Sequence, residues 1–88
     1  MESIKEISLV LSKIKDQSII EEILVCMLTK NEVKNISSRW ELLKLLDKGL
    51  SQRKIAKDLQ LSLCKITRGS KELKKKDSVI KKAIQLIS

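Results

Sequence analysis

The chain has 88 residues and a formal net charge of +8, with no Pro and only two Gly. This length allows one small domain with a limited core, and the composition favours helices throughout. The chain contains no His and one aromatic residue, Trp40, which argues against His-dependent catalysis, His-based metal sites and base stacking on aromatic side chains. We therefore expect an all-α protein with no enzymatic activity and no metal.

Two amphipathic helices are predicted in the first thirty residues. The first carries apolar residues at three- and four-residue steps from Ile4 to Ile14, the second has the apolar residues between Ile19 and Met27, and residues 16–18 separate the two. The longest unbroken apolar run, from Ile23 to Leu28, is too short to span a bilayer, so no membrane segment is expected.

A capping box begins the third predicted helix. In Thr29-Lys30-Asn31-Glu32, the Thr hydroxyl would accept a hydrogen bond from a free helix N–H, and the Glu side chain would reach back to the Thr N–H. Apolar residues then recur from Val33 to Leu46, and Gly49 stands where a left-handed residue ends a helix.

Two short helices joined by a tight turn follow, which is the pattern of a helix-turn-helix. Ser51 is expected to cap a helix over residues 52–59, residues 60–61 form the turn, and Ser62 is expected to cap a helix that reaches about Leu73. Gln60 takes the place of the usual turn glycine, at a cost of roughly 1 kcal/mol for a left-handed residue with a side chain. The inner face is predicted to hold Ile55, Ala56, Leu61 and Ile66, and the outer face Ser62, Leu63, Lys65 and Thr67.

A last helix is predicted from Val79 to Ile87, with Asp77 as its cap. We therefore expect the whole chain to form one domain, in which residues 1–49 provide the core and dimerisation helices, residues 51–73 the helix-turn-helix, and residues 77–88 the C-terminal helix. Cys26 and Cys64 fit no zinc spacing, and we expect them to be reduced, buried residues of a cytoplasmic protein.

The positive charge is concentrated in the second half of the chain. Residues 1–30 hold four basic and five acidic residues, whereas residues 51–76 hold nine basic residues and two acidic ones. A basic patch of this kind favours a polyanion, with nucleic acid first and an anionic membrane surface second. A merely solubilising charged face remains the alternative.

The helix-turn-helix residues resemble the Trp repressor family. The resemblance rests on Leu-Ser-Gln-Arg-Lys-Ile-Ala at 50–56 and on Lys-Ile-Thr-Arg-Gly-Ser-Lys-Glu-Leu-Lys at 65–74. It extends upstream through Met-Leu-Thr at 27–29 and Ser-Arg-Trp at 38–40, so it covers roughly residues 26–74. It implies a six-helix chain that intertwines with a second copy into a homodimer, represses transcription from a double-stranded DNA operator and takes L-tryptophan as co-repressor.

The resemblance also implies roles for single residues. Arg39 and Arg68 would flank the indole ring, Arg68 would pair with the carboxylate, and Gly69 would let the ligand approach the backbone. The ammonium end would lie at Thr29 and at the carbonyls near Cys26 and Leu28. The DNA-facing residues would be Gln52, Arg53, Leu63, Lys65, Thr67, Ser70 and Lys74.

Two residues depart from the family pattern. Glu72 replaces a small polar residue near the ligand's amino group, where it would either pair with the ammonium or repel the carboxylate. Lys65 replaces a smaller residue on the reading face and adds a positive charge there. The competing hypotheses are a related DNA-binding regulator that does not respond to tryptophan, and a module whose Lys74–Lys82 segment and last helix bind an acidic protein or a membrane surface.

Overall fold

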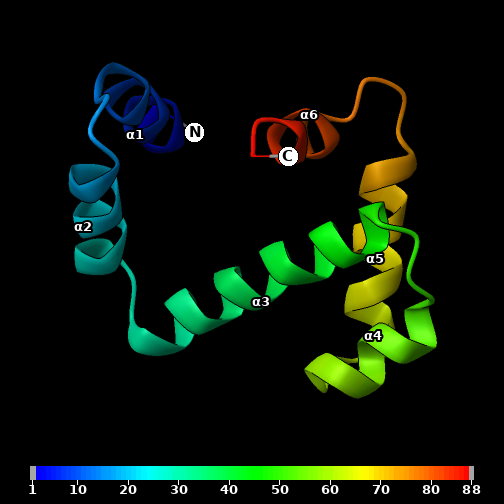
Figure 1. Cartoon of the computed structure of the whole chain (residues 1–88). Coiled ribbons are helices and arrows are strands. Elements are labelled where there is room, and N and C mark those ends of the chain that lie inside the picture. The colour runs from blue at the N-terminus through cyan, green and yellow to red at the C-terminus, as the bar shows by residue number, and fades with distance from the viewer. Residues whose placement is uncertain (1, 88) are drawn as a thin grey trace. The chain divides into compact units, whose positions relative to one another are not determined.

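The structure is a computed structural model that describes residues 2–87. Over these residues the chain forms six helices and no strand, which confirms the all-α prediction (Figure 1). It divides into two compact units between Lys34 and Asn35, and each unit is described by itself. The helices are α1 (Glu2–Lys13), α2 (Gln17–Met27), α3 (Lys30–Asp47), α4 (Gln52–Leu59), α5 (Leu63–Lys74) and α6 (Val79–Gln85).

The first unit contains α1, α2 and the start of α3. The break between α1 and α2 falls at Asp16, whose Oδ1 accepts a hydrogen bond from the Ser18 N–H at 2.9 Å and so caps α2. The capping box at the start of α3 is confirmed in both directions. The Glu32 N–H donates to Thr29 Oγ1 at 3.1 Å, and the Thr29 N–H donates to Glu32 Oε1 at 2.8 Å.

The residues described in α1 and α2 include none that is buried. Their apolar side chains line a shallow hollow between the two helices but remain largely open to solvent. The side chains of Ile4, Leu9, Val25 and Met27 are each more than half exposed. The hollow is lined by Glu6, Ile7, Val10, Leu11, Ile23 and Met27.

The second unit, which holds the rest of α3 and all of α4, α5 and α6, has a core. Leu42 of α3, Ile55 of α4 and Ile66 of α5 are at most 2% exposed and form one cluster. The residues that pack around this cluster are Leu45, Leu46, Leu50, Ala56, Leu59 and Leu61. Three helices therefore meet at these three aliphatic side chains, and this contact fixes the position of α4 and α5 against α3.

Left-handed residues end α3 and α4. Gly49 has φ of +91°, and the Leu50 N–H donates to the Leu45 carbonyl at 3.2 Å, which closes the end of α3 as predicted. Gln60 has φ of +54°, and the Leu61 N–H donates to the Ala56 carbonyl at 3.3 Å. Gln60 therefore adopts the left-handed conformation that a turn glycine would have supplied.

The cap of the last helix differs from the prediction. Ser78, not Asp77, is the capping residue of α6, because the Lys81 N–H donates to Ser78 Oγ at 3.2 Å. Asp77 instead has φ of +57°, so it makes the left-handed turn that precedes the cap. Asp and Ser are both common caps, and the sequence placed two candidates side by side.

The cysteines also differ in part from the prediction. Cys26 and Cys64 are free thiols as expected, but both are exposed, so the prediction that they are buried is wrong. No helix within residues 2–87 combines the length and the apolar character needed to cross a membrane.

Candidate functional site

Helices α4 and α5 form a helix-turn-helix whose two helices begin in the same way. Ser51 and Ser62 are extended residues whose hydroxyl oxygens accept a hydrogen bond from the N–H three residues on. The bonds run from Lys54 N–H to Ser51 Oγ at 3.2 Å and from Lys65 N–H to Ser62 Oγ at 3.4 Å. Both predicted caps are thus confirmed, and each sets where its helix begins.

The burial of residues on the inner and outer faces of the helix-turn-helix agrees with the sequence prediction. Ile55 and Ile66 are fully buried, and Ala56 and Leu61 pack against them, which holds the two helices together. On the other side, six of the seven residues predicted to face DNA are exposed, and Ser70 is partly buried. The exposed residues are Gln52, Arg53, Leu63, Lys65, Thr67 and Lys74.

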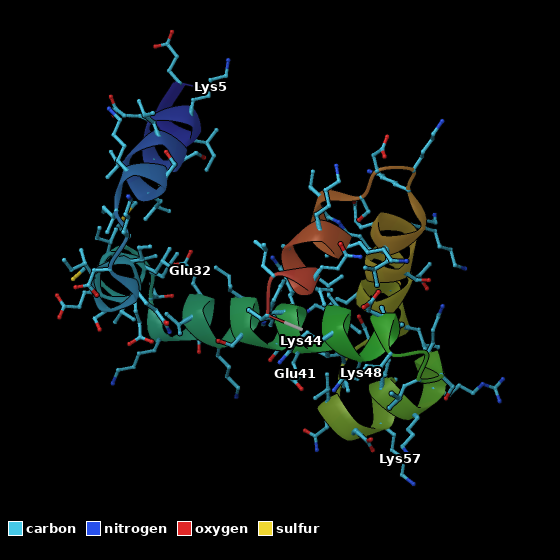
Figure 2. The ribbon with its side chains drawn as sticks, turned by 45° about the horizontal axis from the view of Figure 1, so that its top comes forward. Lys5, Glu32, Glu41, Lys44, Lys48 and Lys57 are labelled. Carbon is cyan, nitrogen blue, oxygen red and sulfur yellow. The ribbon has the colours of Figure 1, made fainter. Side chains whose placement is uncertain are left out.

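The exposed face of α4 and α5 is rich in cations. Lys54 and Lys57 of α4 are exposed, as is Lys71 of α5 (Lys57 is labelled in Figure 2). None of these three takes part in an ion pair within residues 2–87, where the two pairs are Lys44 with Glu41 and Lys75 with Glu72. Unpaired cations on a rigid helical pair are the groups that neutralise phosphates.

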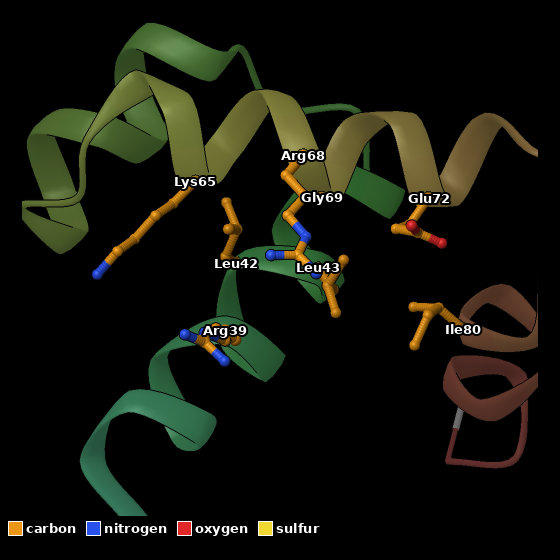
Figure 3. A pocket seen from close by; sticks show the side chains of 8 residues that line it. All are labelled: Arg39, Leu42, Leu43, Lys65, Arg68, Gly69, Glu72 and Ile80. Carbon is orange, nitrogen blue, oxygen red and sulfur yellow. The ribbon is translucent and has the colours of Figure 1, made fainter. Parts of the chain in front are cut away.

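A pocket of about 210 Å³ lies between α5, the second half of α3 and α6, all within the second unit (Figure 3). Its apolar part is formed by Leu42 and Leu43 of α3 and Ile80 of α6. Its polar part is formed by Arg39 of α3 and by Lys65, Arg68, Gly69 and Glu72 of α5. An apolar base with a few convergent charged groups is the usual make-up of a small-molecule site.

The charged groups around this pocket are unevenly placed. In Figure 3, Arg68 reaches down from α5 toward Leu43 and α3, and Lys65 lies at one end of the pocket. Glu72 lies at the other end, beside Ile80. A guanidinium both stacks on a flat ring and forks onto a carboxylate, so Arg39 and Arg68 suit an aromatic acid. The carboxylate of Glu72 adds a partner for a cation at the opposite end.

Gly69 brings α5 close to α3. A Cβ placed on Gly69 would lie 3.3 Å from Leu43 Cδ2 and 3.4 Å from Leu46 Cδ1. The absence of a side chain therefore lets α5 pack tightly on the leucines of α3, at the edge of the pocket that both helices line. Sequence reasoning assigned Gly69 to ligand approach only and did not find this packing contact.

The remaining predicted ligand residues lie in the first unit. Cys26 is exposed in the last turn of α2, Leu28 follows it as the C-cap, and Thr29 caps α3. The hydroxyl oxygen of Thr29 accepts a hydrogen bond from the Glu32 N–H, which leaves its second lone pair and its hydrogen for other partners. The structure thus brings together four of the predicted ligand residues, namely Arg39, Arg68, Gly69 and Glu72. Cys26, Leu28 and Thr29 do not line that pocket.

Four lining residues were not predicted as ligand residues. Leu42 and Leu43 lie within the apolar pattern predicted for the third helix, and Ile80 belongs to the last helix, to which no ligand role was assigned. Lys65 was assigned to DNA alone, although its side chain lines the pocket. Its position four residues before Gly69 on α5 was a usable signal, because residues four apart share a helix face.

Comparisons with known proteins point to one family. A family model described as Trp repressor protein matches residues 2–87. Two curated relatives from Chlamydia trachomatis, of serovars L2 and D, are each named Trp operon repressor homolog and are 33% identical over 75 residues, which is 84% of this chain and 80% of theirs. A Trp operon repressor homolog from Vibrio parahaemolyticus is 38% identical over 68 residues, which is 76% of this chain and 66% of that protein. No solved structure matches the chain significantly.

Proposed function

Because the chain belongs to the Trp repressor family, we propose that it is a sequence-specific, DNA-binding transcriptional repressor that L-tryptophan activates as co-repressor. Its operators would be those of tryptophan-related genes. The observation that carries this proposal is the pocket behind α5, because the helix that would read DNA on one side forms the wall of a ligand-sized cavity on the other. Occupancy of the cavity would then affect how that helix is held.

The DNA contact would run along the exposed face of α4 and α5. The N-terminal part of α5 enters the major groove in this type of motif, so Leu63, Lys65 and Thr67 would meet base edges. Gln52 and Arg53, in the first turn of α4, would contact the phosphates or edges beside them. Ser70 and Lys74, one and two turns further along α5, would complete the contact to the backbone.

Tryptophan would bind with its ring between the guanidinium groups of Arg39 and Arg68. Its carboxylate would pair with Arg68, which reaches into the pocket from α5. Its ammonium group would face Glu72, which ends the pocket on the other side. Glu72 now pairs with Lys75 at 3.0 Å, but this pair is exposed and so is weak enough to exchange for a bound ammonium.

The co-repressor would act by favouring one orientation of the helix-turn-helix. A ligand shifts such an equilibrium only by its difference in affinity for the two orientations. A ligand bound between α5 and α3 would contact both helices, so its affinity would depend on how they are oriented. In a twofold dimer, the favoured orientation would place the two reading helices about 34 Å apart, in successive major grooves.

The proposed repressor is a homodimer that acts in the cytoplasm. The apolar residues of α1 and α2 need a partner surface, since the described part of these helices buries none of them within the unit. Residues 1–49 would supply the intertwined dimer core, residues 51–73 the DNA-binding helix-turn-helix and residues 77–88 the last helix. A twofold dimer would also match two half-sites of an operator.

The test is a mobility-shift assay on the DNA upstream of the chain's own gene, with and without L-tryptophan. We expect tighter and sequence-selective binding with tryptophan, and a higher Tm because the ligand binds the folded state only. An operator affinity and a Tm that are both unchanged by tryptophan would contradict the gating proposal.

A calorimetric titration of two variants then locates the ligand. Arg68→Lys keeps the charge but removes the planar fork, so we expect it to weaken tryptophan binding clearly. Lys71→Arg, on the same helix but outside the pocket, serves as the matched control and should bind tryptophan as the wild type does. Equal affinities for the two variants would place the ligand elsewhere.

A second candidate function is a related repressor that does not respond to tryptophan. The charged residues at the two ends of the pocket favour this candidate. Lys65 and Glu72 place opposite charges at the two ends of the lining, and another ligand that carries opposite charges would pair with them as tryptophan would. A titration with indole-3-propionate, which lacks the ammonium group, separates the two candidates. If Glu72 pairs with the ammonium group, tryptophan should bind more tightly than indole-3-propionate. If the site serves another ligand, neither compound should bind.

A further inference from the structure

A second charged hollow lies at the other end of α5, where the chain turns into α6. This open groove of about 550 Å³ shares no lining residue with the pocket that faces α3. Four lysines and a single carboxylate line it, so its charge is strongly positive. The lining residues are Leu73, Lys74, Lys75, Asp77, Ser78, Lys81, Lys82 and Gln85.

The packing of α6 explains why its lysines face this groove. Ile84 is 4% exposed and Ile80 lines the pocket beside α3, so the apolar side of α6 is turned toward the unit's interior. Lys81 and Lys82 are exposed on the remaining surface. The backbone between the two helices is held by Ser78, which is 8% exposed and accepts a hydrogen bond from the Lys81 N–H at 3.2 Å.

Most of these cations have no partner in the chain. Lys75 pairs with Glu72, but Lys74, Lys81 and Lys82 form no ion pair with any described residue. Three unpaired ammonium groups around one groove repel one another and raise the local potential, which attracts a polyanion. Ammonium groups act as point charges on phosphates and do not distinguish bases, so the contact would be independent of sequence.

The groove continues the surface of the reading helix. Lys74 is both the last residue of α5 and part of the groove, so a phosphate backbone that follows α5 would reach the α6 lysines next. A membrane surface suits the groove less well, because binding in the interface requires an apolar face and Leu73 is the one apolar side chain in the lining.

We propose that the groove between α5 and α6 is a second DNA contact, in which Lys81 and Lys82 bind phosphates that flank the bases read by α5. This proposal rests on the proposed function as a DNA-binding repressor. The groove would raise affinity for any duplex and leave the preference among sequences to the helix-turn-helix.

The test compares salt dependence in the full chain. For the double variant K81Q/K82Q, we expect the slope of log K against log salt concentration to fall in magnitude by about 3.6, since a bound dimer would lose four phosphate contacts and each contributes about 0.9. The affinity ratio between the chain's own upstream DNA and a scrambled duplex should stay within about twofold of the wild type. The matched control K5Q/K13Q removes the same charge from α1 and should leave the slope unchanged, and circular dichroism checks that both variants fold.

Each alternative result is distinct. A wild type that binds its upstream DNA selectively, together with an unchanged slope in K81Q/K82Q, would overturn the groove and leave the proposed function standing. A wild type without any preference among duplexes would overturn both. Loss of binding to phosphatidylserine vesicles, or of saturable inorganic phosphate binding, with an unchanged DNA slope would assign the lysines to a membrane or to a free anion and overturn the proposal.

Discussion

The two units of the chain use the same kinds of helix but differ in what they bury. In the second unit, Leu42, Ile55 and Ile66 are at most 2% exposed, whereas the described residues of α1 and α2 include no buried side chain. Yet the apolar residues of α1 and α2 are as numerous as those of a helix that faces a core. The difference shows that amphipathic spacing predicts which side of a helix needs covering but not what covers it.

A further contrast concerns what the buried contacts do. In the second unit the cluster of Leu42, Ile55 and Ile66 fixes α4 and α5 against α3, and so shapes both the exposed face of the helix-turn-helix and the pocket. In the first unit the hollow between α1 and α2 is apolar and open. A unit that makes its own core can present a site, while a unit without one gains most from a second copy of the chain.

The largest expected effect tests the core of the second unit. Ile66→Ala removes a fully buried side chain and leaves a cavity, so we expect a loss of about 2–5 kcal/mol of unfolding free energy in urea titrations followed by circular dichroism. Leu63→Ala, three residues earlier on α5, changes a side chain that is 55% exposed and should cost less than about 0.5 kcal/mol. Equal losses would mean that Ile66 is not the residue that anchors α5.

The next prediction tests the uncovered face of the first unit. Val10 is 47% exposed and lines the hollow between α1 and α2, and a second copy of the chain would bury it. Val10→Ser would then place a hydroxyl in an apolar contact, at a cost of about 1–3 kcal/mol. The loss should appear as a weaker dimer in sedimentation equilibrium and as a Tm that depends more on protein concentration.

The matched control for Val10→Ser lies on the same helix. Lys5→Ser introduces the same residue about 140° around α1, on an exposed position outside the hollow, and should leave the dimer unchanged. If both variants dissociate equally, or if the wild type is a monomer at every concentration, the first unit is not covered by a second copy in this way.

Local signals predicted the elements of the fold well. The spacing of apolar residues and the capping residues Ser51, Ser62 and Thr29 gave the helices to within a few residues, because each of these signals acts over one turn of backbone. Asp77 was wrong as the cap of α6, since the adjacent Ser78 competes for the same role. The exposure of Cys26 and Cys64 was missed because burial depends on which elements meet, and single residues carry little of that information.

The pocket was predicted in part. Arg39, Arg68, Gly69 and Glu72 came from a resemblance and do line one cavity, but their binding role stays a prediction. Ile80 and the dual position of Lys65 required knowing how α6 and α5 lie against α3, which depends on tertiary packing. The leucines near Gly69 show the same limit, because the close approach of two helices is a property of the pair.

Side-chain helix caps occur in both units, and removing one should have a smaller effect on stability than removing a core side chain. Ser62→Ala removes the oxygen that accepts from the Lys65 N–H, so we expect a loss of about 1 kcal/mol in urea unfolding. Ser62→Asp keeps an acceptor at the same place and should lose much less. A similar loss in both variants would mean that Ser62 acts through something other than its cap.

The smallest expected effect concerns backbone strain, which again separates the units. All described residues with positive φ, namely Gly49, Gln60 and Asp77, lie in the second unit. Gln60 has φ of +54°, a conformation that favours Gly over a residue with a Cβ, so Gln60→Gly should raise the unfolding free energy by about 0.5–1 kcal/mol. Asp tolerates this region better than Gln does, so Asp77→Gly, at φ of +57°, should gain less. Urea midpoints measured side by side would decide the order, and a destabilised Gln60→Gly variant would show that the Gln60 side chain contributes more than its backbone strain costs.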